Sequence, residues 1–444
     1  MIPVQVQVGW VSRMRAQFGT AFRALRHRNY RLWFFGQGLS LIGTWMQSMA
    51  QQVLVYRLTG SASALGIVSF MQVIPLVPFA LWGGSLSDRV SKRTLLLTTQ
   101  TLMLCQAIVL AVLTWTGAVQ IWHVYLMAFL LGTFKAVDMP ARQSFVVEMV
   151  EGKEDLTSAI GLNSAIQNGA KTLGPALAGV IVAMMGEAVA FFLNSLSFLA
   201  VIASLLLMKD TIRTSVDRLE NTHVVTHVVE GMRFVFGQQT LLVLMSLVAV
   251  SSFLSRPYQI LMPVFADVEL GDSAQPIIQF LCSGRHLIPN CQAPAALPLG
   301  LLLTAVGLGA VTGAFLVASL SQRARRGRML TLGNLSYPLL LLVFVNSHSI
   351  LFSLLVLVLV GLSQVLQNAM ANTLLQITTP DPLRGRVMSL YSLVSGGMAH
   401  VGGLQAGFVA DWIGAPMSVG IGAAISLLYG LVIALRYRRV RNLT

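Results

Sequence analysis

The stretch GGSLSDRVSKR, residues 83–93, places an acid and several cations between two long apolar runs. One run precedes the charges at 64–86 and the other follows them at 94–117, and each is long enough to cross a bilayer. Cations between two such runs are typical of loops on the cytoplasmic side of a membrane. The stretch therefore predicts a short loop that joins two transmembrane helices.

The composition extends this interpretation to the whole chain. Of its 444 residues, 55% are hydrophobic and 10% are charged, whereas soluble domains have about 25% charged residues. A soluble fold of this composition would expose too much apolar surface. We therefore expect an all-α membrane protein with twelve transmembrane helices. The expected spans are 31–57, 64–86, 94–117, 120–140, 158–185, 187–208, 240–264, 297–320, 329–346, 350–378, 388–411 and 417–436, and the region 329–378 allows a second division.

The positive charges follow these spans. Most of the 30 lysines and arginines fall in alternate loops, on one side of the expected membrane. Arg57 and Arg285 lie towards the other side, and Lys135, Lys171 and Arg256 lie within spans. By the positive-inside rule, both termini are cytoplasmic. The formal net charge of +14 then reflects topology and attraction to the lipid bilayer, and nucleic acid is not an expected partner.

The spans form two sets of six. We expect an amphipathic cytoplasmic arm at 1–30, a bundle at 31–208, a cytoplasmic linker at 209–239, a second bundle at 240–436 and a basic tail at 437–444. The arm shows no pattern of a cleaved signal peptide.

The two sets also resemble each other in sequence. When GLNSAIQNGAKTLGPALAG (161–179) is compared with SLYSLVSGGMAHVGGLQAG (389–407), Gly174 falls on Gly402 and Gly179 falls on Gly407. Internal repeats of six spans indicate a secondary transporter with its site near the middle of the bilayer.

These motifs resemble a known family. GGSLSDRVSKR is similar to the loop signature of the major facilitator superfamily, with Ser91 in place of a usual glycine. GTWMQ (43–47), DMPARQS (138–144) and GPALAG (174–179) resemble the branch that contains the enterobactin exporter. The resemblance implies two pseudo-symmetric six-helix bundles, a bacterial inner (plasma) membrane and efflux of a small organic molecule.

The resemblance also implies a conformational latch at the loop after the second span. Its residues are Gly84, Asp88, Arg89, Lys92 and Arg93, and Arg142 is the expected partner from the fourth span. The alternative is that these residues simply supply positive charge to a cytoplasmic loop.

Lys135, Asp138 and Arg142 lie at helical spacing on the fourth span, so they share one helix face. An acid inside a membrane span is a functional candidate. Two flanking cations favour a latch or gate, but a proton carrier and a plain interfacial charge stay open. Pro140 either kinks this helix or ends it.

Polar side chains recur at helical spacing on several spans, where an amide that faces lipid would be costly. A row of amides on 350–378 favours a cavity wall, whereas interhelical hydrogen bonds explain single amides well. Arg256 either binds an anionic or oxygen-rich substrate or reaches the outer interface near Asp267. The cavity and substrate candidates are Gln37, Gln47, Gln51, Lys171, Arg256, Gln364, Asn368 and Asn372.

Lys171 lies beside Gly174 and Pro175 in the fifth span. Gly174, Pro175 and Gly179 predict close helix packing, as in the antiporter signature that GPALAG resembles. Lys171 either meets substrate at an interface or forms a structural pair. His400 is a second proton or gate candidate, because its ordinary pKa lies near neutrality; a neutral, hydrogen-bonded histidine is the alternative.

Cys282 and Cys291 lie in a loop expected outside the membrane, where we expect them to form a disulfide. The sequence contains no nucleotide-binding loop, no metal-ligand spacing and no catalytic motif, so we expect no enzyme activity, no metal and no cofactor.

The expected function is proton-driven antiport that exports a small organic molecule, such as a siderophore-like metabolite or a drug, from a monomer. A facilitator or symporter that imports a small or lipid-like solute is one alternative. A membrane scaffold or membrane enzyme is the alternative from another class.

Overall fold

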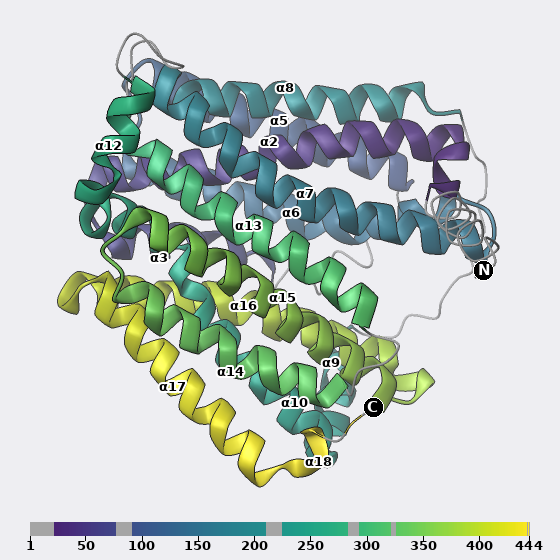
Figure 1. Ribbon diagram of the computed structural model, residues 1–444. Helices are drawn as coiled ribbons and strands as arrows, with labels where there is room; N and C mark the ends of the chain where they lie inside the picture. The colour runs from purple at the N-terminus through teal and green to yellow at the C-terminus, as the bar shows by residue number, and fades with distance from the viewer. Residues whose placement is uncertain are drawn as a thin grey trace, which may run out of the picture.

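The computed structural model describes residues 22–76, 91–209, 224–282, 293–320, 326–441 and 443. In this part of the chain, twelve helical rods occupy the twelve expected spans in order (Figure 1). Their bounds are α2 (Arg28–Thr59), α3 (Ala62–Val73), α5 (Lys92–Trp115), α6 (Ile121–Glu148), α7 (Lys153–Met185), α8 (Glu187–Leu207), α10 (Gln239–Val250) continued by η2 (Ser251–Ser255), η3 (Arg256–Gln259), α11 (Met262–Val264) and η4 (Phe265–Glu269), α13 (Ala296–Leu320), α14 (Arg326–Val345), α15 (Ile350–Thr378), α16 (Asp381–Ile413) and α17 (Ala415–Arg436). Shorter elements are η1 (Arg23–Arg26), α9 (Val224–Gly237), α12 (Gly271–Cys282) and α18 (Arg438–Arg441).

The helix ends refine the expected spans. Among the described residues, eight helices are long and apolar enough to cross a membrane by length and composition. α14 ends at Val345 and α15 begins at Ile350, which settles the division of 329–378. α6 continues beyond Pro140 to Glu148, so Arg142 lies on a helix rather than in the loop that follows it.

The segments outside the spans also contain helices. α9 lies within the expected linker and packs against the first turns of α16, where Arg386 forms an ion pair with Glu230. Most of the expected N-terminal arm, residues 1–21, lies outside the described residues. The described end of the arm is joined to the first turn of α7, because Arg23 and His27 both contact Asp155.

The two halves meet along two pairs of helices, α7 with α13 and α3 with α16 (Figure 1). Glycines allow this approach. A Cβ atom on Gly407 would lie 2.6 Å from the carbonyl oxygen of Ala62, and one on Gly300 would lie 2.7 Å from the Cα of Gly179. These distances leave no room for a side chain, so the backbones of the two halves are in direct contact.

The sequence repeat has a counterpart in this packing. Gly174 lies against α2, the first rod of its own half, and Gly402 lies against Phe253 in the first rod of the second half. Gly179 and Gly407 each contact the second rod of the opposite half, α13 and α3. Corresponding glycines therefore make corresponding contacts, as a pseudo-twofold relation requires.

The hydrophobic core is continuous between the halves at one end only. We call the end at which α2 begins and α17 ends the terminal end and the opposite one the far end (Figure 1). At the far end, one cluster of buried residues combines Leu54 and Val182 of the first half with Leu299 and Ala410 of the second. At the terminal end, each half has a separate cluster.

Close packing within the second half gives a first testable prediction. A Cβ on Gly309 of α13 would overlap the carbonyl oxygen of Val358 on α15. We expect Gly309→Leu to destabilise this half by about 3 kcal/mol or more, because the helices must separate to admit the side chain. The measurement is the monodisperse fraction on size-exclusion chromatography after extraction in detergent.

Gly161→Leu is the matched control, since a Cβ at this position of α7 meets nothing within 4 Å. Equal recovery of the two variants would contradict the expected packing constraint.

Candidate functional site

Asp138 lies on α6, and only 1% of its surface is exposed. Its Oδ1 accepts hydrogen bonds from Thr99 and Gln100 on α5, each at 2.9 Å. Arg142 donates from Nη2 to the other carboxylate oxygen. Asp138 and Arg142 therefore meet on one helix face, and the carboxylate also ties α6 to α5. The sequence analysis missed Thr99 and Gln100, although polar residues on the buried face of an apolar span are a usable signal.

Lys135 lies one turn before Asp138 and is half-buried. It lies on the same helix face as Asp138 and Arg142. In the described part of the chain, Lys135 forms no hydrogen bond or ion pair of its own. Lys135 thus differs from Arg142, which is engaged within its own half.

The latch candidates are only partly described. Gly84, Asp88 and Arg89 lie outside the described residues. Lys92 forms an ion pair with Glu148 at the end of α6, and Arg93 donates to the carbonyl oxygen of Leu206 on α8 at 3.2 Å. These contacts join helices of the first half to each other.

The glutamines of α2 are deeply buried. Gln37, Gln47 and Gln51 are each at most 3% exposed. Gln47 accepts a hydrogen bond from Asn194 of α8 at 2.5 Å and donates to Gln106 of α5 at 3.4 Å. This placement favours the interhelical alternative for Gln47. Gln37 Oε1 and Gln51 Nε2 are buried without a hydrogen-bond partner among the described residues.

The amides of α15 connect it to neighbouring rods. Gln364 donates to the hydroxyl of Tyr337 on α14 at 3.2 Å and accepts a bond from Gln259 of η3 at 3.4 Å. Asn368 and Asn372 are half-buried on the same row towards the terminal end. Asn372 accepts a hydrogen bond from Gln376 at 2.6 Å. The row is therefore continuous, with its first member buried and its later members accessible.

Arg256 lies where the seventh rod is irregular. The α-helix of α10 gives way to the π-helical turn η2, and Arg256 begins the 3₁₀ turn η3, followed directly by Pro257. Such interruptions are frequent at functional sites. Arg256 Nη1 donates to the carbonyl oxygen of Ser395 on α16 at 2.9 Å and to the hydroxyl of that serine at 3.3 Å. Arg256 therefore points to α16 and not to Asp267.

Lys171 on α7 lies over the ring of Trp45 on α2, with its Nζ 5.7 Å from the ring centroid. Arg256 is bonded to α16, and His400 of the same helix contacts Ser69 of α3, so polar groups lie along the boundary between the halves. We call Lys135, Lys171, Arg256 and His400 the central basic cluster. All four side chains retain accessible surface although helices flank them.

Direct hydrogen bonds between the halves lie at the far end and near the middle. His400 Nδ1 is 2.7 Å from the hydroxyl of Ser69 on α3. Asp411 of α16 caps the start of α3: its carboxylate accepts from the backbone N–H of Ala62 at 2.7 Å and of Ser63 at 3.1 Å, and from the hydroxyl of Ser61. An anion at a helix N-terminus is stabilised by the unpaired N–H groups and the helix dipole. The far end is therefore held by polar as well as apolar contacts.

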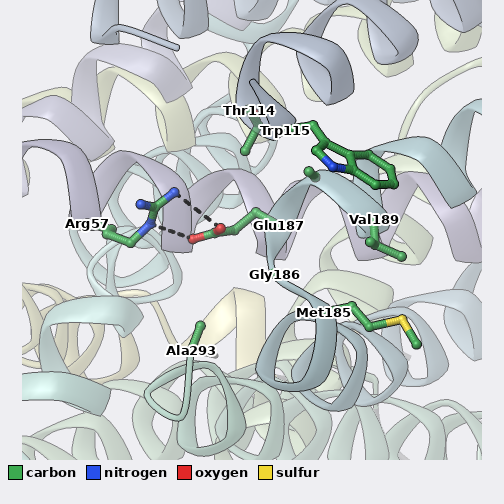
Figure 2. Close-up of a pocket in the computed structure, with 9 residues that line it drawn as sticks. Arg57, Thr114, Trp115, Met185, Gly186, Glu187, Val189 and Ala293 are labelled. Atoms are coloured by element: carbon green, nitrogen blue, oxygen red, sulfur yellow. Dashed lines mark hydrogen bonds and ion pairs between the residues drawn. The ribbon is translucent and has the colours of Figure 1, made fainter. Parts of the chain in front are cut away.

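A separate cavity of about 400 Å³ lies at the far end (Figure 2). Glu187, at the start of α8, accepts two hydrogen bonds from Arg57, at 2.9 and 3.3 Å. Thr114, Trp115 and Ala293 also line the cavity. The ion pair joins the end of α2 to the start of α8. Because Arg57 already pairs with the carboxylate, no free charge is left for a ligand.

The remaining candidates concern packing, cysteine and metal. Pro175 lies inside α7, and its carbonyl oxygen lies against Gly300, as expected for a packing residue. Cys282 ends α12, but Cys291 lies outside the described residues, so the disulfide stays a prediction. No group of three or more metal-ligating side chains is present among the residues that the structure describes.

Known proteins resemble this chain over most of its length. The sequence profile of the family "Transmembrane secretion effector" matches residues 19–281 and 288–443. The staphyloferrin A transporter of Staphylococcus aureus is 29% identical over 177 residues, which is 39% of this chain and 44% of that protein. The enterobactin exporter EntS of Shigella flexneri is 22% identical over 421 residues, which is 94% of this chain and 94% of that protein.

Solved structures share the fold. The nucleoside transporter NupG superposes with a TM-score of 0.67 at 12% identity, covering 94% of this chain and 99% of that one. A peptide transporter POT gives a TM-score of 0.66 at 16% identity over 93% and 95% of the two chains. Identity this low establishes the fold alone. Together with the family profile, these matches make the chain a member of the transmembrane secretion effector family, a multi-span transporter family of the major facilitator superfamily.

Proposed function

We propose that this chain is a proton-driven antiporter that exports a small organic molecule across the plasma membrane by alternating access. The observation that carries the proposal is the asymmetry of the two ends. The halves share a core at the far end, have separate cores at the terminal end, and bring polar groups together between them. This is the arrangement expected when two bundles rock about a central site.

The positive-inside distribution supports an orientation in which both termini are cytoplasmic. The terminal end then faces the cytoplasm and the far end faces outward. In this orientation, the shared core at the far end supports a conformation that is closed on the outside. Relatives named as siderophore transporters, macrolide efflux proteins and multidrug efflux pumps support export of a small organic molecule.

In this proposal the substrate contacts come from both halves. The first half contributes Lys171 and Lys135. The second half contributes Arg256 and the row Gln364, Asn368 and Asn372. Gln37 and Gln51 extend the polar surface on α2. Gln47 keeps a structural role, because Asn194 and Gln106 already occupy its amide.

We assign proton coupling to His400 rather than to Asp138. Thr99, Gln100 and Arg142 all donate to the carboxylate of Asp138, which suits a permanent tie between α5 and α6. His400 instead bonds across the halves to Ser69, so its contact must break when the far end opens. A histidine that gains and loses this contact is able to couple protonation to the transport cycle.

Flux in proteoliposomes with an imposed pH gradient tests the proposal. The probes are citrate, 2,3-dihydroxybenzoate, erythromycin and ethidium, which cover carboxylate, catecholate, macrolide and cationic solutes. A gradient that drives uphill movement of any probe supports antiport. Downhill movement that ignores the gradient would instead support the facilitator, and uphill movement in the same direction as protons would support the symporter.

Lys171 provides a residue-level prediction. We expect Lys171→Ala to reduce the initial rate of transport about tenfold or more, because a charged partner of the substrate contributes about 1.5–3 kcal/mol. The amount of protein recovered from the membrane should change little, since Lys171 has accessible surface and no ion pair in the described chain. Transport at the original rate would show that Lys171 does not bind substrate and is only a structural partner of Trp45.

A further inference from the structure

The central basic cluster contains more positive charge than the protein neutralises. Within the described residues, the ammonium group of Lys171 contacts only the ring of Trp45. Lys135 and Arg256 are half-buried, and a charge that loses part of its hydration is normally paired. Within the described residues, Lys135, Lys171 and Arg256 form no ion pair with a carboxylate.

The nearest acid does not change this balance. Asp138 lies close to Lys135, but Thr99, Gln100 and Arg142 already occupy its two oxygens. Asp138 and Arg142 pair with each other, so Asp138 leaves Lys135 without an ion pair. Lys135, Lys171 and Arg256 are therefore three cationic side chains without a carboxylate partner among the described residues.

The unused hydrogen-bond donors of Arg256 are a second, independent reason to expect an anionic ligand. Only its Nη1 is used, on Ser395, and within the described chain its Nε and Nη2 donate no hydrogen bond. The guanidinium fork matches a carboxylate in two-point geometry. Next to it, the hydroxyl of Ser255 is fully buried without a partner among the described residues. The irregular segment η2–η3 holds Arg256 at the position where the α-helix is interrupted.

We propose that the substrate is a polycarboxylate, with one carboxylate bound by Arg256 and another by Lys171, and with Lys135 adding long-range attraction. The proposal deepens the export function above and rests on it for the direction of movement. The two cations lie on opposite halves, on η3 and on α7. A ligand with two carboxylates is therefore able to bridge the halves, whereas a cationic drug is repelled by the same charges.

Equilibrium binding of radiolabelled citrate to the full chain, in nanodiscs of phosphatidylcholine, tests this assignment. We expect saturable binding that weakens as sodium chloride is raised, because salt screens charge attraction. Triethyl citrate, the neutral ester of the same skeleton, and ethidium should not compete. Nanodiscs that contain phosphatidylglycerol should bind citrate with similar affinity if a soluble carboxylate, and not a lipid headgroup, is the ligand.

Single-charge variants locate the site. Lys171→Gln and Arg256→Gln should each weaken citrate binding about tenfold or more. Lys171→Arg should retain most of the affinity, which separates loss of charge from loss of folding. Arg436→Gln, at the end of α17, removes the same charge outside the cluster and should bind citrate normally.

The possible results separate the substrate class from the export function. Citrate that binds with these variant effects but is not moved in proteoliposomes would support the polycarboxylate site and contradict export. Ethidium or erythromycin that is exported while citrate shows no saturable binding would support export and overturn the polycarboxylate site. Equal citrate affinity in Lys171→Gln, Arg256→Gln and the unmodified chain would also overturn it.

Discussion

Replacing Gly407 with leucine is expected to abolish transport while leaving each half folded. Gly407 brings α16 into contact with the backbone of α3, where even a Cβ would lie 2.6 Å from the carbonyl oxygen of Ala62. A leucine there acts as a wedge between the halves at the far end. Overpacking of this kind costs about 1–3 kcal/mol, which shifts a two-state equilibrium about 5- to 150-fold away from the closed form.

The conformational effect is measurable apart from transport. Ser69 is buried at the contact of α3 with α16, so a Ser69→Cys thiol reports opening of this contact. A Cys105→Ser background removes the exposed free thiol on α5. We expect Gly407→Leu to accelerate maleimide labelling of the Ser69→Cys thiol and to reduce probe flux below about a tenth.

Gly385→Leu is the control for the wedge. Gly385 lies on the same helix, near the terminal end, and a Cβ there meets nothing within 4 Å. This variant should label and transport like the unmodified chain. Normal flux in Gly407→Leu would show that the far end does not need to close as tightly as the structure has it.

The second large effect is expected at Asp138. Changing it to asparagine removes the negative charge opposite Arg142 and leaves Thr99 and Gln100 with a poorer acceptor. Breaking a buried ion pair by removing one partner costs about 3–5 kcal/mol, because the other charge stays buried without compensation. We expect a clearly lower midpoint of thermal unfolding in detergent and a loss of probe flux.

Glu148→Gln is the matched control for Asp138→Asn. Glu148 pairs with Lys92 at the terminal end, where both side chains are about one-third exposed. Exposed pairs contribute about 0–1 kcal/mol, so this variant should unfold near the original temperature. Equal midpoints for the two variants would mean that Asp138 is not a structural tie. Normal stability of Asp138→Asn with flux that no longer follows the pH gradient would make Asp138 the proton carrier.

The positions of the membrane rods follow directly from the apolar pattern. The expected span 350–378 coincides with α15, and the other described rods start or end within several residues of expectation. The bilayer demands about 20 apolar residues per crossing and internal backbone hydrogen bonding, so composition alone is enough to locate a span. The expected positions of helix ends are less accurate where polar residues continue a helix beyond the apolar region, as at the start of α16 and the end of α6.

The site was only partly readable from the sequence. Helical spacing correctly brought Asp138 to Arg142, because both lie on one helix and local geometry determines their separation. The same reasoning could not distinguish Gln47, which bonds Asn194 and Gln106, from Gln364, which lies beside Tyr337 and Gln259. The partners of each glutamine lie far away in the chain, and an amide has the same periodicity whether it faces a cavity or another helix.

The sequence by itself determined that the chain is an all-α membrane protein with two repeated halves, since hydropathy and the paired glycines are local properties of the chain. Only the tertiary structure decided which end is closed and which polar groups of the two halves meet. The cap of Asp411 on α3 and the bond of His400 to Ser69 each join residues from different halves. Their proximity depends on how two bundles dock, and docking is set by backbone contact at Gly407 and Gly300, which no pattern within one helix records.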